Sequence, residues 1–366
     1  MLLQPRQATN KVTPCVHGGI DYAELKKPGV SLETILDFSV SCNPFGPPPG
    51  IREALADISI ERYPDSEASE LQQALAVKLN IAPGKLIIGS GSTELIRLIA
   101  TAYFEPNDLV LIPQPTYGEY EVACHLANTQ ILKQPFLKEP DFQLNTDEMT
   151  NLLQKHRPKA VFLCNPNNPT GQYMSREQVE HIMSSYQDSL VVLDEAYIAF
   201  TKNAWSSQDM VDLGNLVILR SMTKDYALAG LRLGYAITAE PIISVLKRVR
   251  PPWNVNTPAQ KAGILALNAD GYLKECSSKI REARDFLIKE LERLGLPPLP
   301  SQTNFFLVKV GDATAFRQAL LKKGILVRDC TSFGLPQYIR LAPRTLPECQ
   351  KLIESIKEVG VPSHAS

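Results

Sequence analysis

The residues best suited to chemistry lie directly after three apolar runs in the middle of the chain. Asp194 ends the run SLVVLD, and Lys224 comes four residues after the run NLVILR. A third run, KAVFLC, leads into the amide-rich segment CNPNNPTG at residues 164–171. Taken alone, each has an ordinary interpretation, because Asp after a strand is often a helix cap or turn former and Lys is usually a solvated surface charge.

Taken together, these groups fit one cofactor that carries an aldehyde, a pyridine ring and a phosphate. Lys224 would attack the aldehyde, provided that its neighbours lower the pKa of its amine. Ser221 and Thr223 offer hydroxyls for a phosphate ester beside the lysine. Asp194 would keep the pyridine nitrogen protonated, so that the ring accepts electrons from a carbanion. The combination predicts pyridoxal 5'-phosphate.

A glycine-rich turn, GSGSTE at residues 89–94, offers a second contact for that phosphate. The turn opens a predicted helix, whose free amides and positive dipole end attract anions. A dinucleotide-binding domain is the alternative for such a turn. It is disfavoured because the G-x-G-x-x-G spacing is missing and LDEAY is a poor acidic site for a ribose.

The elements that must position these residues are buried strands alternating with helices. The runs are almost entirely apolar, which is typical of parallel strands covered on both faces, and ligands of such sheets lie outside the carboxyl ends of the strands. The predicted strands are 85–89, 108–113, 159–164, 189–194, 215–220 and 233–238, and the clearest helices between them are 93–103, 146–156 and 175–186.

The C-terminal third predicts a smaller α+β unit. A long helix is expected over 257–295, followed by a strand at 304–310, a helix at 313–324, strands at 324–330 and 338–343, and a closing helix near 347–359. We therefore expect an N-terminal arm over 1–45, a large domain over 46–270 and a small domain over 271–366. The arm is expected to pack with the small domain and the substrate site.

Composition narrows the function classes. Of 366 residues, 44% are hydrophobic and the net charge is -1, so neither a disordered chain nor binding to nucleic acid or anionic lipid is indicated. Seven dispersed cysteines without a C-x-x-C pair predict neither a disulfide framework nor a metal site. With no apparent signal sequence or membrane span, we expect a cytoplasmic enzyme.

From His17 to about Gly360 the chain resembles the fold-type-I pyridoxal-phosphate enzymes of the class I/II aminotransferase family. The resemblance implies an α/β fold, with a mostly parallel seven-stranded sheet covered by helices in the large domain and a small α+β domain beside it. It rests on motifs in the family's order: RYPD (62–65), GSGSTE, PTYGEY (115–120), NPNNPTG (165–171), LDEAY (193–197), SMTK (221–224) and GLRLGY (230–235).

The resemblance also assigns roles around the cofactor. Lys224 matches the lysine that binds the aldehyde, and Asp194 matches the acid that pairs with the pyridine nitrogen. Asn168 and Tyr197 match the donors to the ring hydroxyl oxygen, and Tyr117 matches the aromatic that stacks on the ring. Lys224, Asp194 and Tyr197 would be the catalytic residues. The residues that match the phosphate cradle are Ser92, Thr93, Ser221, Thr223 and Arg232.

Other residues would bind the substrate or a second subunit. Tyr63 resembles a residue that reaches the neighbour's cofactor phosphate, so a homodimer with shared sites is expected. Arg340 resembles the arginine that grips the substrate's carboxylate or phosphate as a bidentate pair. Arg328, His17 and Asn43 would contact the same anionic groups.

Two subgroups of the family are similar to this chain. Histidinol-phosphate aminotransferases share its central motifs. L-threonine-O-3-phosphate decarboxylases share them too, together with the HGG start at 17–19, the arm segments DFS at 37–39 and NP at 43–44, and the tryptophan of PPWNVN (251–256). On the arm we expect the decarboxylase of the cobalamin pathway, acting through an imine of a small phosphorylated amino compound. The alternative is the transaminase of histidine biosynthesis.

A regulator is the remaining alternative, because the same fold occurs fused to DNA-binding heads. The chain shows no helix-turn-helix pattern before the fold and no basic stripe, so the enzyme is favoured.

Overall fold

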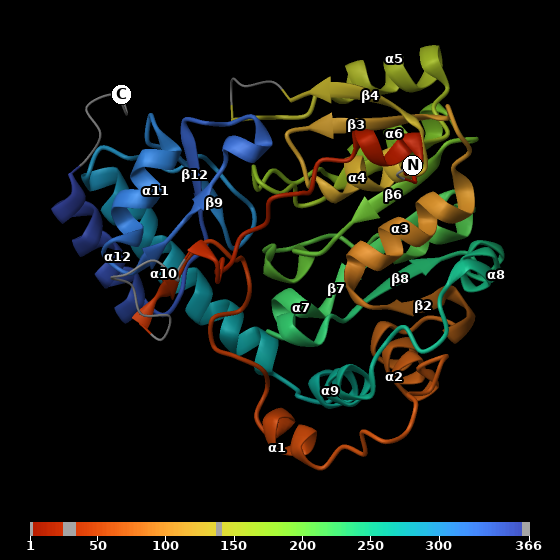
Figure 1. Ribbon diagram of the computed structural model, residues 1–366, viewed down its shortest axis with the longest axis horizontal. Helices are drawn as coiled ribbons and strands as arrows, with labels where there is room; N and C mark the ends of the chain where they lie inside the picture. Colours follow the sequence, from red (N-terminus) through yellow and green to blue (C-terminus); the bar gives the residue numbers. More distant parts are fainter. Residues whose placement is uncertain (1–2, 25–33, 137–140, 361–366) are drawn as a thin grey trace.

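A seven-stranded sheet runs through the larger part of the molecule (Figure 1), in the order β2-β8-β7-β6-β5-β3-β4. The computed structural model describes residues 3–24, 34–136 and 141–360. The strands are β2 (Leu86–Gly89), β3 (Leu109–Gln114), β4 (Gln130–Pro135), β5 (Ala160–Cys164), β6 (Leu190–Asp194), β7 (Leu216–Ser221) and β8 (Gly234–Thr238). β8 runs antiparallel to both of its neighbours, β2 and β7, and all other pairs in this sheet are parallel. The predicted mostly parallel sheet is therefore confirmed.

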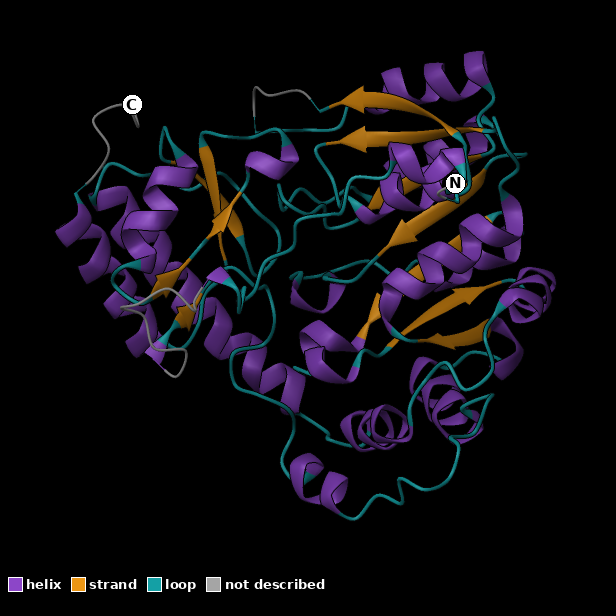
Figure 2. Cartoon of the chain, in the orientation of Figure 1, coloured by secondary structure: helices purple, strands orange, loops and turns teal. Residues whose placement is uncertain are grey.

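Helices cover both faces of this sheet (Figure 2). Successive side chains of a strand point to opposite faces, so Val161 belongs to one buried cluster and Phe162 to the other. The first cluster includes apolar residues of α2 (Ser69–Leu79), α5 (Thr146–His156), α6 (Arg176–Ser185) and α9 (Thr257–Leu267). The second includes those of α3 (Gly91–Tyr103), α4 (Glu119–Leu126) and α8 (Glu240–Val249).

The smaller domain contains an antiparallel sheet in the order β11-β12-β9. Its strands are β9 (Phe306–Lys309), β11 (Arg328–Asp329) and β12 (Tyr338–Leu341), and its helices are α10 (Tyr272–Arg293), α11 (Ala313–Leu321) and α12 (Leu346–Val359). One apolar cluster joins them and includes Phe38 of the N-terminal segment. Beside Phe38, β1 (Leu36–Asp37) pairs in parallel with β10 (Ile325–Leu326).

The N-terminal segment connects the two domains. Its first turn, η1 (Gln7–Lys11), lies beside α4, where Arg6 donates to the Leu126 carbonyl at 3.4 Å. The chain then crosses toward the small domain, as the red trace in Figure 1 shows. After β1 it continues to α1 (Ile51–Ala56) of the large domain.

Some element predictions were wrong in detail. The long helix expected over 257–295 is two helices, because the chain turns at Asn268–Gly271 and Gly271 has a φ of 77°. The expected strand at 324–330 is two short strands that pair with different partners. β4 was not predicted, since its sequence QILKQP is polar and it lies at the sheet edge. Among the described helices, none is long and apolar enough to cross a membrane.

Candidate active site

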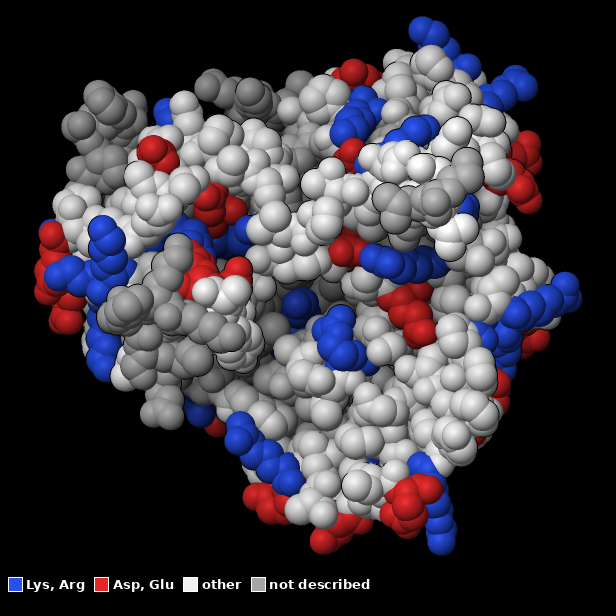
Figure 3. Space-filling view, viewed as in Figure 1, with Lys and Arg blue, Asp and Glu red and all other residues white. Residues whose placement is uncertain are grey.

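A cavity of about 130 Å³ lies where the carboxyl ends of β5, β6 and β7 face the small domain. The face shown in Figure 3 is hollowed between the two domains, and Lys or Arg side chains are visible inside the hollow. The N-terminal segment contributes Cys15 to Gly18 to the lining. The cavity is therefore enclosed by three parts of the chain that are far apart in sequence.

The cavity brings together all but two of the residues expected at the site. Those that line it are His17, Ser92, Thr93, Tyr117, Asn168, Asp194, Tyr197, Ser221, Thr223, Lys224, Arg232, Arg328 and Arg340. Asn43 and Tyr63 do not belong to this lining.

Asn43 contacts the lysine segment. Its backbone N–H donates to the Lys224 carbonyl at 2.8 Å, and its side-chain amide donates to the Asp225 carbonyl at 3.0 Å. These bonds fix the backbone that carries Lys224. A direct contact of Asn43 with substrate stays a prediction.

Tyr63 lies on the surface of the single chain. Its residue is 78% exposed, and its ring stacks on Trp253 with 4.3 Å between centroids. An aromatic pair left this open to water has room for a further partner.

Asp194 is held in a position almost without water. It is 3% exposed, and its carboxylate accepts hydrogen bonds from the Tyr120 hydroxyl at 2.7 Å and the Ala196 N–H at 3.0 Å. Burial raises its pKa to about 6, while these two bonds oppose the rise. Tyr120 was missed as a site residue, although it lies three positions after Tyr117 in the motif PTYGEY.

Lys224 faces the ring of Tyr197, with 5.9 Å between its Nζ and the ring centroid. The pKa of Lys224 is raised, because the negative charge that Tyr197 carries when ionised outweighs the lowering by burial. That the neighbours of Lys224 lower this pKa when the cofactor is bound stays a prediction. The positive charges of Arg340 and Arg232 do act in the expected direction.

One side of the cavity collects hydroxyls, a helix start and an arginine. The Ser221 and Thr223 hydroxyls are hydrogen-bonded to each other at 2.6 Å. A Cβ atom on Gly91, the first residue of α3, would lie 2.7 Å from Arg232 Nη2, so glycine lets this guanidinium lie over the helix start. A positive side chain and free helix amides form a seat for a phosphate group.

The opposite side holds Arg328 and Arg340, which face each other in the pairing of β11 with β12. Arg340 donates to Asn168 Oδ1 and to the Ser39 carbonyl, the latter at 2.8 Å. Arg328 donates to the Val16 carbonyl and to Ser332 Oγ, both at 2.7 Å. Burial and the charge of Arg340 lower the pKa of Arg328.

These features fit the expected cofactor. A buried carboxylate with a raised pKa is stabilised by a cationic ring nitrogen, and the seat beside α3 suits a phosphate ester. Tyr117 lies between these two features, with its hydroxyl 3.2 Å from Thr93 Oγ1 and its ring edge-on to Tyr120.

Comparison with known proteins agrees with this site. Residues 33–356 match the family model of aminotransferase class I and II. The histidinol-phosphate aminotransferase of Thermoanaerobacter pseudethanolicus is 36% identical over 312 residues, which cover 84% of this chain and 87% of the relative.

Solved structures have the same fold. Histidinol-phosphate aminotransferase from Sinorhizobium meliloti in complex with pyridoxal-5'-phosphate has a TM-score of 0.80 at 26% identity, covering 88% of this chain and 89% of that one. L-threonine-O-3-phosphate decarboxylase from Porphyromonas gingivalis has a TM-score of 0.77 at 26% identity, covering 88% and 98%. The chain belongs to the aminotransferase class I and II family and is a pyridoxal-phosphate-dependent enzyme.

Proposed function

We propose that this enzyme transfers the amino group of a small phosphorylated amino compound, with histidinol phosphate as the first candidate substrate. The names of the relatives support this substrate over the decarboxylase expected from the arm. The 36% identical relative is a histidinol-phosphate aminotransferase, as is the solved structure from Sinorhizobium meliloti.

The buried arginine pair carries the proposal of an anionic substrate. Arg328 and Arg340 are 6% and 5% exposed, and their hydrogen-bond partners in the described chain are all neutral. Like charges directly opposite each other on paired strands repel, and buried unpaired charges are costly. Nε of Arg340 also has no hydrogen-bond partner among the described residues. A phosphate or carboxylate in the cavity would relieve both costs.

The residues that would hold the cofactor are those around Asp194 and the start of α3. Asp194 would pair with the ring nitrogen, Asn168 and Tyr197 would donate to the ring hydroxyl oxygen, and Tyr117 would cover the ring. The phosphate would be held by Ser92, Thr93, Ser221, Thr223 and Arg232. When bound, pyridoxal phosphate supplies an electron sink for the pair of electrons released at the substrate's α-carbon.

Lys224 would bind the cofactor's aldehyde and, once released by the substrate's amine, move a proton at the α-carbon with its Nζ. Arg328 and Arg340 would orient the substrate by its anionic group. That orientation decides which bond to the α-carbon is broken, because the bond perpendicular to the ring system is the one that weakens. Buried walls around Asp194 and Tyr197 would keep water away from the released electrons.

Decarboxylation of L-threonine-O-3-phosphate is the second candidate, supported by the similarity to the decarboxylase from Porphyromonas gingivalis and compatible with the position of His17. This imidazole lines the cavity together with both arginines. A substrate with a phosphate and a carboxylate needs more cationic or N–H donors than one with a phosphate alone. An oxo-acid acceptor also carries carboxylates, so the donor count alone fits both candidates.

The experiment that tests the proposal separates the two reactions. Protein incubated with cofactor should gain the absorbance of the lysine-bound cofactor, and Lys224→Ala should not. Without an oxo acid, histidinol phosphate should then lose at most one amino group per bound cofactor, and continued turnover should require an oxo acid. Release of carbon dioxide from L-threonine-O-3-phosphate without an oxo acid would establish the second candidate instead. Absence of both reactions would overturn the proposed substrate class.

We further propose a homodimer in which Tyr63 reaches the neighbouring site, and a division into an arm over 1–45, a large domain over 46–270 and a small domain over 271–366. A cytoplasmic location is also proposed. All seven cysteines are unpaired, which fits a reducing compartment.

A further inference from the structure

We propose that Glu119 is a positioning residue, which holds His17 of the N-terminal segment at the cavity so that its imidazole helps to bind the substrate's anionic group. The inference rests on the proposed function in one respect, that the substrate carries an anion. It assigns a role to a carboxylate outside the cavity lining and explains how an N-terminal segment becomes part of the site.

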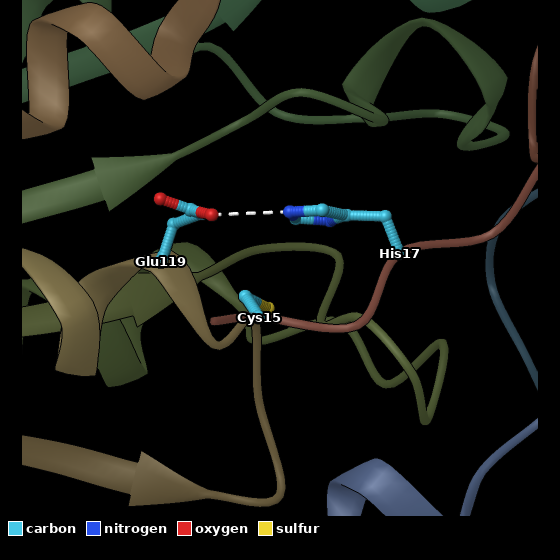
Figure 4. A group of neighbouring side chains, drawn as sticks. All are labelled: Cys15, His17 and Glu119. Carbon is cyan, nitrogen blue, oxygen red and sulfur yellow. Dashed lines mark hydrogen bonds and ion pairs between the residues drawn. The ribbon is translucent and has the colours of Figure 1, made fainter. Parts of the chain in front are cut away.

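The contacts of Glu119 run from a helix surface to the cavity edge. Its Oε1 is 3.0 Å from His17 Nε2, and its Oε2 accepts from Arg97 Nη2 at 3.1 Å. Figure 4 shows the imidazole and the carboxylate pointing directly at each other, from the N-terminal segment and from the start of α4. The side chain of Glu119 is 8% exposed, whereas those of Arg97 and His17 are about half exposed, at 48% and 49%. The buried carboxylate therefore lies between two more exposed side chains.

The ionised state of the Glu119 carboxylate fixes the orientation of the imidazole. The hydrogen bond from His17, together with Arg97, lowers the pKa of Glu119 despite its burial. An ionised carboxylate only accepts hydrogen bonds, so Nε2 of His17 must carry a proton and donate it. Nδ1 faces away from Glu119, and in the protonated imidazole, which the Glu119 carboxylate stabilises, it carries a second N–H that can donate to an anion. The ring belongs to the cavity wall, 5.9 Å from the ring of Tyr117 between centroids.

Two glycines let the segment lie close enough for this contact. A Cβ on Gly18 would be 2.4 Å from the Ser39 carbonyl oxygen, and one on Gly118 would be 2.6 Å from Cys15 Sγ. Gly19 N–H donates to Ser39 Oγ at 2.8 Å, while the Ser39 carbonyl accepts from Arg340. The segment is thus packed on both domains, and His17 is the imidazole that it presents to the cavity lined by the two arginines.

Cys15 lies near this contact, and its Sγ, a His17 nitrogen and a Glu119 oxygen lie within 4.8 Å of one another. Both carboxylate oxygens already have nitrogen partners, one of them a guanidinium. A metal ion would have to displace those partners and bind beside a positive charge. These contacts therefore indicate a hydrogen-bonded group that positions His17, and not a metal site.

The test is a double-mutant cycle on the cofactor-loaded enzyme. Binding of histidinol phosphate and of L-threonine-O-3-phosphate is followed by the change in cofactor absorbance, and turnover is measured in parallel. Glu119→Gln and His17→Asn should each raise the half-saturating concentration about tenfold, the effect of losing one hydrogen bond to a charged group, with a smaller change in kcat. The double variant should be no worse than His17→Asn, because Glu119 acts through His17.

Glu121→Gln is the matched control, since Glu121 lies on the same helix but pairs with Lys133 at 2.9 Å. It should bind both compounds as the wild type does. Arg97→Gln changes a half-exposed residue, so it can replace Glu119→Gln in the test if that variant does not fold. It should also weaken binding of the two compounds, by less than Glu119→Gln does.

A spectroscopic measurement tests the positioning role without turnover. The chain has five histidines, so imidazole ¹⁵N signals of histidine-labelled protein can be assigned with His17→Asn. Glu119→Gln should shift the His17 signals alone. Unchanged His17 signals, or losses that add in the double variant, would overturn the role of Glu119. A wild type that binds neither compound would overturn the proposed substrate class instead.

Discussion

Asp194 is a carboxyl group that the fold holds in an unfavourable place. Its pKa is raised from 3.8 to about 6 by burial, so the ionised form costs folding free energy in the cofactor-free protein. The cost is absent below about pH 4, grows as the pH rises, and is complete above about pH 6, on the order of a few kcal/mol. Asp194→Asn should therefore raise the Tm of the cofactor-free protein at pH 8 and leave it nearly unchanged at pH 4.

The same substitution should remove most of the activity, because a neutral amide does not keep the ring nitrogen charged. Asparagine is a fair control for shape, since the Tyr120 hydroxyl can accept from an amide as well as donate to a carboxylate. A Tm difference that is equal at both pH values would contradict the raised pKa. Full turnover by Asp194→Asn would contradict the role of the carboxylate.

Single residues were predictable where a motif fixes them at a strand end. Asp194 ends a buried strand, Lys224 and Asn168 come three and four residues after two others, and the sheet brings them to one cavity. The contact of His17 with Glu119 was not predictable, because it joins residues 102 positions apart that share no motif. The direction of the Asn43 side chain depends in the same way on tertiary packing.

Elements were predictable where burial on both faces gives an apolar run. The six predicted strands of the large sheet all exist, with ends within two residues of those expected. The strand β4 lacks such an apolar run because it lies at the edge of the sheet, where only one neighbouring strand covers it. The direction of β8 depends on its pairing with β2 and β7, which its composition does not encode.

The start of α3 is held by a close approach of β8. A Cβ on Gly234 would lie 2.8 Å from the Ser92 nitrogen and 2.9 Å from the Arg220 carbonyl oxygen, and these backbone atoms cannot rotate away. Gly234→Ala should push α3 away from the phosphate seat. We expect weaker cofactor binding by titration and a loss of about 1–3 kcal/mol of stability, as in other overpacked sites.

Gly230→Ala is the control for that change. Gly230 is exposed, and a Cβ there would meet no atom within 4 Å. The Tm of the Gly230→Ala protein should therefore stay within about 1 °C of the wild type, as for most surface changes. Normal cofactor affinity in Gly234→Ala would show that the start of α3 can shift without weakening cofactor binding. That result would contradict the proposal that its backbone N–H groups bind the cofactor phosphate.

At the scale of the whole molecule, the single chain leaves several large apolar side chains exposed, among them the stacked pair of Tyr63 and Trp253. Ile60 is 88% exposed, Tyr63 is 78% exposed, and Trp253 beneath Tyr63 is 47% exposed. Clustered exposed apolar groups mark contact surfaces, and a symmetric pair would bury the same patch on both copies. This arrangement supports the proposed homodimer, in which each Tyr63 serves the other chain.

A dimer that shares residues between chains predicts complementation. Tyr63→Ala and Lys224→Ala should each be impaired alone, the first in retaining the cofactor and the second in binding its aldehyde. In a mixed dimer one site receives an intact Lys224 and an intact Tyr63, while the other receives neither. Random pairing makes half of the dimers mixed, so activity should reach about a quarter of the wild-type level.

Asp194→Asn mixed with Lys224→Ala is the control, because both changes affect a chain's own cavity and no intact site can form. If the Tyr63→Ala mixture is no more active than its parents, Tyr63 acts within its own chain or not at all, and the shared site is refuted even if the protein is a dimer.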